Sequence, residues 1–349
     1  MDSQPRYVAR RRRPQYGRTL LALAGVFAAG VSTADALLTL DRGATAARPT
    51  AVGSHAPRPH RRSRPGPSSV SQIGSYLVSS RAMILISRLR GRSIPRVLPT
   101  LVLYPTEPAQ AVAAGKLTRG PFPLVVFVPG DLQCRSAYAA LLHAWASAGY
   151  VVAAVQFPPA RCDVGDSHEA DLSIQPADIS AAITDLLTVS IRSLGVLSGL
   201  IDPAKIAVAG HARGGDAAAA VAADTCCRNR RVLAAMILSG AEWAPFGGRY
   251  FPAGTPPMLV VQGSADSRNP PAAAAALYLA DTTGTRYYLD LLGAGHFTPY
   301  EGHAVPEPIV ARVTVDFLDR YLAREPAPLT ADGNVPGFAV LVSRGHLPG

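Results

Sequence analysis

The chain has 349 residues, of which 48% are hydrophobic and only 17% charged, so it is long and apolar enough to build one large α/β core. Its formal net charge of +10 comes almost entirely from residues 1–65, which hold twelve arginines and three aspartates. The rest of the chain is nearly neutral, and this excludes a basic nucleic-acid-binding body.

The first 40 residues combine a positive head with an apolar run. Arg10–Arg13 precede the apolar stretch Thr19–Val31, and the small residues of Ser32–Ala36 follow it. This order is typical of a secretory signal peptide. The apolar stretch also continues to Leu40, about 22 residues in all, which is close to the length of a membrane-spanning anchor. Both alternatives stay open, and both place the rest of the chain outside the cytoplasm, either secreted or anchored on the outer face of the cytoplasmic membrane.

A linker, a folded domain and a tail are expected after this segment. Residues 41–70 are dominated by Pro, Ser, Gly and Arg, and they cannot bury enough apolar surface to offset the entropy of ordering. Residues 71–325 carry the regular apolar runs of a folded domain. The tail, residues 326–349, reads as a loop, although Phe338–Val342 could add a short strand.

The first half of the domain shows a strand, a helix and a second strand. Pro123–Val128 is an apolar run that ends in the turn Pro129–Asp131. A helix containing Trp145 follows, and Val151–Phe157 is the next apolar run. Short runs of this kind, bounded by turn residues, are typical of buried parallel strands.

A glycine-rich turn comes next. The apolar residues Ile206–Ala209 lead into the turn Gly210-His-Ala212-Arg-Gly214, and Asp216–Ala223 predicts a helix. The two glycines flank position 212, and their missing side chains allow the turn to pack closely against its neighbours. This is the context of the G-x-S-x-G nucleophile elbow, but alanine stands where the elbow carries serine.

Two polar residues follow the next predicted strands. Pro257–Gly263 is an apolar run, and Asp266 comes just after it. Arg286–Leu292 predicts another strand, and His296 lies in the glycine turn that follows. Because the carboxyl ends of parallel strands lie at one edge of a sheet, both side chains are expected near the turn at Ala212.

These motifs resemble the α/β-hydrolase family, in which nucleophile, acid and histidine follow in this chain order. The similarity covers residues 75–325 and is greatest to the bacterial polyester-hydrolase and chlorophyllase-like (dienelactone-hydrolase-like) branch. It implies an α/β fold with a mostly parallel central sheet and helices on both faces. The sequence shows no long lid insertion between the predicted strand 233–240 and Asp266, so we expect no large lid. The resemblance also implies site roles: Ala212 at the nucleophile position, Asp266 as acid, His296 as base, and the backbone N–H groups of Asp131 and Arg213 as the oxyanion site.

Three functions stay open, because a methyl group cannot attack a carbonyl carbon. In the first, the chain is a degenerate hydrolase of the serine esterase and lipase type that binds an acyl or aromatic ligand without cleaving it. Alternatively, it derives from an active carboxylic-ester hydrolase in which Ala212 is a substitution. The third alternative is chemistry without serine, with His296 as a general base. In each case we expect a small-molecule or polymeric ester-like ligand, no cofactor and no metal site.

The four cysteines suit an oxidising compartment. Cys134 and Cys162 follow strands that are neighbours in the resembled fold, so a Cys134–Cys162 disulfide is one expectation. Cys226 and Cys227 are adjacent in sequence, and here we expect two thiols rather than a strained disulfide.

Overall fold

The structure is a computed structural model that describes residues 73–88, 94–108, 120–158, 169–192, 194–282, 284–302 and 305–344. The chain divides into two units, residues 1–63 and 64–349, and every described residue belongs to the second. The predicted signal or anchor and the predicted linker 41–70 therefore lie outside the described residues. Among the helices of the described ranges, none has both the length and the apolar character to cross a membrane.

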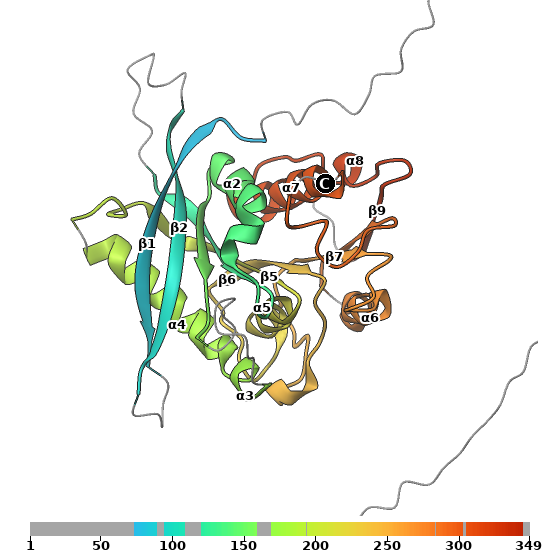
Figure 1. The fold of residues 1–349 in the computed structure, drawn as a ribbon, viewed down its shortest axis with the longest axis horizontal. Coiled ribbons are helices and arrows are strands. Elements are labelled where there is room, and N and C mark those ends of the chain that lie inside the picture. Colours follow the sequence, from blue (N-terminus) through green and yellow to red (C-terminus); the bar gives the residue numbers. More distant parts are fainter. Residues whose placement is uncertain are drawn as a thin grey trace, which may run out of the picture. The chain divides into compact units, whose positions relative to one another are not determined.

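One nine-stranded sheet forms the centre of the second unit, in the order β1-β2-β4-β3-β5-β6-β7-β8-β9 (Figure 1). The strands are β1 (Tyr76–Ser87), β2 (Arg96–Pro108), β3 (Phe122–Val128), β4 (Val151–Val155), β5 (Ile201–His211), β6 (Val232–Leu238), β7 (Met258–Gly263), β8 (Arg286–Leu291) and β9 (Ala339–Arg344). The strands from β4 to β8 pair in parallel, and β1, β2 and β9 join the two edges in antiparallel fashion. The prediction of a mostly parallel α/β sheet is confirmed.

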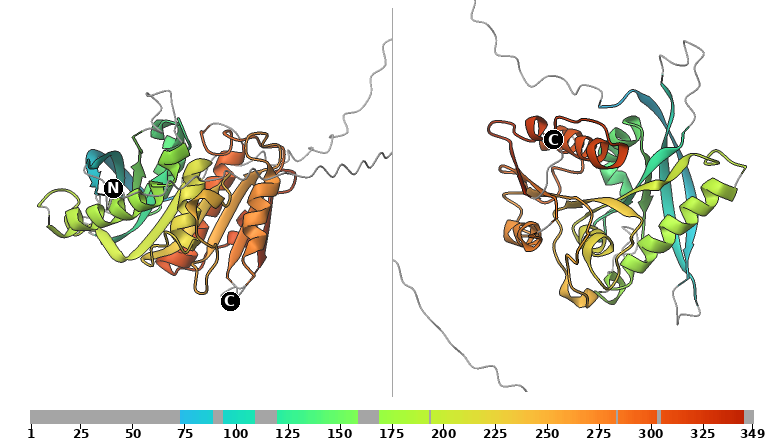
Figure 2. Two further views of the ribbon diagram at one scale, coloured as in Figure 1. Left: turned by 90° about the horizontal axis from the view of Figure 1, so that it is seen from below. Right: turned by 180° about the vertical axis from the view of Figure 1, so that it is seen from behind.

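Helices cover both faces of this sheet (Figures 1 and 2). They are α2 (Ala139–Ser147), α3 (Glu169–Leu172), α4 (Gln175–Arg192), α5 (Arg213–Ala223), α6 (Pro271–Ala280), α7 (Pro306–Leu318) and α8 (Leu329–Asp332). One buried cluster joins α4, α5 and α6 to the sheet, and a second joins α2, α7 and α8 to the opposite face. In β3, Val126 packs into the first cluster and Phe127 into the second, because successive strand residues point to opposite faces.

The carboxyl ends of four strands bring the predicted site together. The turn at Gly130 follows β3, Ala212 follows β5, Asp266 follows β7, and His296 follows β8. Residues 239–257, between β6 and β7, carry a short 3₁₀ turn, Ala244–Phe246, and an isolated bridge from Tyr250 to Asp224. The described connection between β6 and β7 therefore holds no large lid.

Several elements differ from the sequence-based expectation. The strand β5 begins five residues before the predicted apolar run Ile206–Ala209, because Phe122 pairs with Ile201 and Leu124 pairs with Ile206 across an irregularity in the register. The antiparallel strands β1 and β2 have no counterpart among the predicted elements. The tail contributes α8 and β9, and β9 pairs with β8 from Leu291↔Ala339 to Arg286↔Arg344.

The expectation of two thiols at the adjacent cysteines is wrong. Cys226 and Cys227 are joined in a disulfide. A tight turn after α5 explains the pairing: the N–H of Cys226 donates to Oδ1 of Asp224 at 3.0 Å, and the N–H of Cys227 donates to the Asp224 carbonyl at 3.2 Å. Cys134 is not a free thiol, and Cys162, its predicted partner, lies outside the described residues.

Candidate active site

The turn between β5 and α5 has a strained backbone at Ala212. This residue adopts φ 50° and ψ −123°, a conformation that glycine enters freely and that alanine resists. A Cβ atom on Gly210 would collide with the Gly214 carbonyl, and a Cβ on Gly214 would collide with the Val128 carbonyl of β3. The two glycines thus permit the close contacts that hold the turn, as the sequence predicted.

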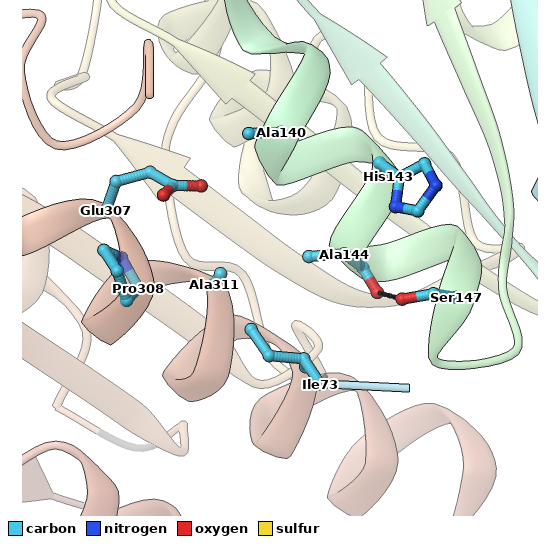
Figure 3. Close-up of a pocket in the computed structure, with 8 residues that line it drawn as sticks. All are labelled: Ile73, Ala140, His143, Ala144, Ser147, Glu307, Pro308 and Ala311. Atoms are coloured by element: carbon cyan, nitrogen blue, oxygen red, sulfur yellow. Dashed lines mark hydrogen bonds between the residues drawn. The ribbon is translucent and has the colours of Figure 1, made fainter. Parts of the chain in front are cut away.

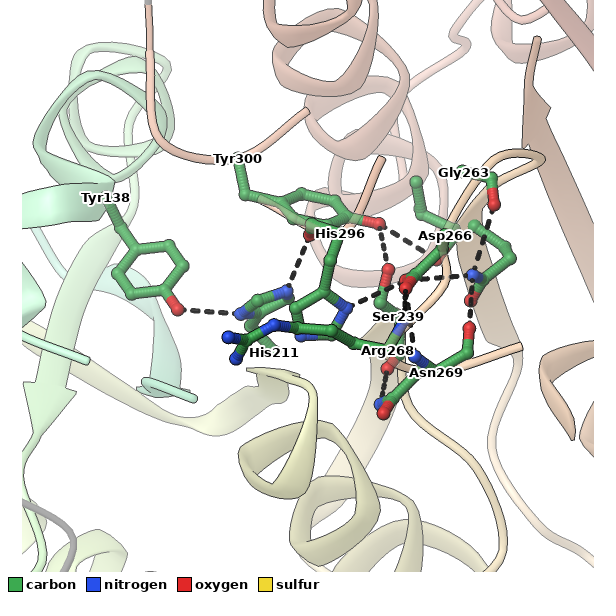
Figure 4. Close-up of polar contacts among 11 residues, drawn as sticks. Tyr138, His211, Ser239, Gly263, Asp266, Arg268, Asn269, His296 and Tyr300 are labelled. Atoms are coloured by element: carbon green, nitrogen blue, oxygen red, sulfur yellow. Dashed lines mark hydrogen bonds and ion pairs between the residues drawn. The ribbon is translucent and has the colours of Figure 1, made fainter. Parts of the chain in front are cut away.

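Asp266 and His296 form a hydrogen-bonded pair beside this turn (Figure 4). The Nδ1 atom of His296 lies 2.8 Å from Oδ2 of Asp266. The other oxygen of Asp266 accepts the backbone N–H groups of Arg268 and Asn269, each at 2.9 Å. Burial raises the pKa of Asp266, but the hydrogen bonds from His296 and from the Asn269 backbone outweigh it and hold this pKa below its usual value. Asp266 is therefore an ionised carboxylate that orients the His296 ring.

The oxyanion positions carry opposite side-chain charges. The Nε atom of Arg213 lies 3.8 Å from Oδ2 of Asp131, and the Arg213 side chain is 45% exposed. The first backbone bond across the turn runs from the Asp216 N–H to the Ala212 carbonyl, so the Arg213 N–H precedes the regular bonds of α5. The Asp131 carboxylate is directed toward Arg213. The positive charge of Arg213 offsets the negative charge of Asp131 near the predicted oxyanion site.

A second histidine, His211, lies directly before Ala212 and is fully buried. Its Nδ1 atom is 2.7 Å from the hydroxyl of Tyr138, and its Nε2 atom is 3.1 Å from the carbonyl oxygen of His296. Burial, and next the charge of His296, lower the pKa of His211 to about 3, so its ring is neutral at physiological pH. From the sequence, no role is expected for His211 beyond its place in the turn Gly210–Gly214.

Phe297 lies beside the pair, and two further aromatic residues lie in the loop after β6. Phe297 stacks edge-on against His296, with ring centroids 4.6 Å apart, and the guanidinium of Arg268 lies 4.9 Å from the Phe297 ring centre. Trp243 and Phe246, from the loop after β6, contact each other, with ring centroids 4.7 Å apart. Tyr300 is completely buried, and its hydroxyl donates to the Val261 carbonyl, so it belongs to the core rather than to a ligand surface.

A separate pocket of about 510 Å³ lies between α2 and α7 (Figure 3). Its lining residues are Ile73, Ala140, His143, Ala144, Ser147, Glu307, Pro308 and Ala311. None of the predicted site residues lines it, so the geometry of the candidate site does not depend on this pocket.

The comparisons with known proteins agree with this arrangement. The family model of PETase, described as PET hydrolase-like, matches residues 100–326, which is more than half of the chain. No curated protein matches the chain. The matched region begins within β2 and contains Ala212, Asp266 and His296. The chain therefore belongs to the PET hydrolase-like family, a family of the α/β-hydrolase type.

Proposed function

We propose that this protein binds an ester-like acyl or aromatic ligand in a hydrolase site that forms no acyl-enzyme. The observation that carries the proposal is Ala212, which occupies the strained turn between β5 and α5. A serine at this position would supply the attacking oxygen, and a methyl group has neither a lone pair nor a proton to give up.

The preserved surroundings of Ala212 support a binding role. Residues in such strained conformations typically cost about 1–3 kcal/mol and persist only when the structure around them enforces them. Here Gly210 and Gly214 still permit the tight turn, and Asp266 still holds the His296 ring. A chain with no function at this site would gain stability if the turn relaxed to an unstrained conformation.

The side chains around the pair favour an apolar ligand with an aromatic or acyl group. Phe297 is partly buried and contacts the His296 ring, with ring centroids 4.6 Å apart. Partly exposed aromatic side chains give a large contact area at low entropic cost. The ligand is either a small molecule or a polymeric ester.

The substitution Ala212→Ser tests the proposal. It adds one oxygen to an otherwise family-like site, and we expect hydrolysis of p-nitrophenyl butyrate together with covalent labelling by a fluorophosphonate. The unmodified chain should show no labelling at position 212. The double variant Ala212→Ser/Asp266→Asn is the matched control, and it should react far more slowly because the wrong tautomer of His296 is held. Labelling of the unmodified chain at position 212 would overturn the proposal.

A second candidate function rests on the complete Asp266–His296 pair. With its Nδ1 hydrogen-bonded to Asp266, the ring can use Nε2 to remove a proton from water or from a ligand. Slow hydrolysis by the unmodified chain that disappears in His296→Gln would favour this function. Slow hydrolysis that survives His296→Gln would come from binding alone.

We also propose that the domain works outside the cytoplasm, secreted or held at the membrane through its N-terminus. The Arg-rich head with the apolar stretch Thr19–Leu40 supports this location, and so does the Cys226–Cys227 disulfide. Cell fractionation with mass spectrometry of the N-terminus tests it. Cleavage after Ala36 indicates secretion, and membrane retention with an intact N-terminus indicates an anchor. An uncleaved, soluble cytosolic chain would contradict both.

A further inference from the structure

A buried chain of hydrogen bonds crosses the candidate site. It runs from the turn Pro129–Asp131 after β3, here called the oxyanion turn, to the loop after β8 that carries His296, here called the base loop. The backbone N–H of Gly130 donates to the Tyr138 hydroxyl at 3.2 Å. That hydroxyl lies 2.7 Å from Nδ1 of His211, and Nε2 of His211 lies 3.1 Å from the carbonyl oxygen of His296 (Figure 4). Neither Tyr138 nor His211 has any exposed surface.

Only one arrangement of protons in His211 satisfies every group. A carbonyl oxygen can only accept, so Nε2 of His211 carries the proton that is donated to His296. In the neutral ring Nδ1 is then an acceptor, and the Tyr138 O–H donates to it. A second proton on His211 would force the Tyr138 O–H to turn away from Nδ1, although Tyr138 has no surface exposed to solvent.

The groups around His211 are consistent with a permanently neutral ring. Tyr138 lies on one side, the ring of His296 is 4.7 Å away between centroids, and the ring of Tyr300 is 4.8 Å away. Burial is the largest influence on the pKa of His211, and the nearby charge of Asp266 opposes it only in part.

We propose that His211 and Tyr138 are positioning residues that hold the base loop at a fixed place relative to the oxyanion turn. Asp266 fixes the ring of His296 through Nδ1, and His211 fixes the backbone of the same residue through its carbonyl. His296 is therefore held from two sides, by Asp266 in the loop after β7 and by His211 at the end of β5. The inference rests on the proposed function only for the role of His296, because the positions of the protons can be measured without any ligand.

Nuclear magnetic resonance of the unmodified, ¹⁵N-histidine-labelled protein gives the first test. We expect His211 as the Nε2–H tautomer with no titration between about pH 5 and pH 9, whereas an unperturbed histidine titrates near 6.5. A His211 signal that titrates in this range, or that shows the Nδ1–H tautomer, would overturn the proposal.

Two isosteric variants then separate the two ends of the His211 ring. In His211→Asn the amide lies near the position of Nδ1, so it can still accept from Tyr138 but cannot reach His296. In His211→Gln the amide lies near the position of Nε2 and can still donate to the His296 carbonyl. We expect the Nδ1 proton of His296 to exchange with water about fivefold faster in the Asn variant and to stay close to its original rate in the Gln variant, as loss of one neutral hydrogen bond implies. Equal exchange in the two variants would count against positioning through the carbonyl.

A matched control is available far from the site. The hydroxyls of Tyr287 and Tyr321 also form a pair at 2.7 Å, and Tyr287 is fully buried in β8. Tyr287→Phe removes a tyrosine hydroxyl bond of the same length but should leave the His296 proton unchanged, whereas Tyr138→Phe should accelerate its exchange. Equal effects of the two variants would show that the signal reports only stability.

The proposed function and this inference fail separately. In the Ala212→Ser background, adding Tyr138→Phe should slow fluorophosphonate labelling about tenfold or more, because small displacements of a catalytic group are costly. If Ala212→Ser is never labelled but His211 shows the expected tautomer, the proposed function fails and the positioning role stands. If labelling occurs and is indifferent to Tyr138→Phe, the positioning role fails.

Discussion

At the scale of single residues, the backbone of Ala212 matters as much as its missing hydroxyl. The strain at φ 50° predicts that Ala212→Gly stabilises the fold. We expect a gain of about 1 kcal/mol, since alanine at positive φ is disfavoured relative to glycine by roughly that amount. Chemical denaturation measures it. Ala218→Gly, inside α5, is the control and should instead destabilise by about 1 kcal/mol or more. A loss of stability in Ala212→Gly would show that the turn is not strained.

Asp216 predicts a pH-dependent difference in stability. Burial raises its pKa to about 7, while the backbone N–H of Ala241 donates to it at 2.8 Å. In the unfolded chain this carboxyl ionises near 3.9, so the folded state loses stability as pH rises from about 4 to about 7, at up to about 1.4 kcal/mol per pH unit. Asp216→Asn lacks this ionisation, so its stability relative to the unmodified chain should increase across the same window. Urea denaturation at pH 4, 5.5 and 7 checks this. A pH-independent difference would contradict the raised pKa.

The residues that sequence could and could not identify differ in how they are connected. Asp266 and His296 were predicted because each lies shortly after an apolar strand and because the two follow the glycine turn in the chain order of the resembled family. Tyr138 was not identified, because its contact to His211 joins residues 73 positions apart. The buried network around the base loop depends on packing, which a single sequence does not reveal.

At the scale of elements, the packing of α5 against β3 depends on Gly214. Its missing side chain leaves room for the Val128 carbonyl. Gly214→Ala would force the two apart, and we expect a loss of about 2–3 kcal/mol, as is usual for overpacking in a tight core. Gly215→Ala is a milder control, since its nearest contact would be the Gly210 carbonyl at 3.0 Å. Thermal denaturation compares the two, and equal melting temperatures would refute the steric argument.

Prediction of the elements themselves succeeded where strands are buried on both faces. The runs at β3, β5, β7 and β8 contain few polar residues, because helices cover both sides of the sheet. The antiparallel strands β1 and β2 were not predicted because they mix exposed and buried residues, as in the exposed Ile84 next to the buried Leu85. The disulfide of Cys226 and Cys227 was not predicted, because the turn that holds the two cysteines is built around Asp224. The role of Asp224 is visible only in three dimensions.

At the scale of the whole molecule, the C-terminal tail is part of the sheet. Leu329 and Leu341 are buried, and β9 covers the edge of β8. Deleting residues 329–349 should cost about 2 kcal/mol for each of these leucines and expose the edge of β8 to aggregation. Soluble yield and size-exclusion chromatography measure the effect. A chain that lacks only residues 345–349, beyond β9, is the control, and equal behaviour of the two truncations would show that the tail is dispensable.

The strained turn at Ala212 also has a genetic meaning. Its conformation depends on Gly210, Gly214 and the strand ends around them, and not on the side chain that the turn presents. Alanine and serine codons differ by a single base in their first position. On the proposed function, the mutational distance between a binding protein and an esterase is therefore one nucleotide, and the rest of the gene can pass from one state to the other unchanged.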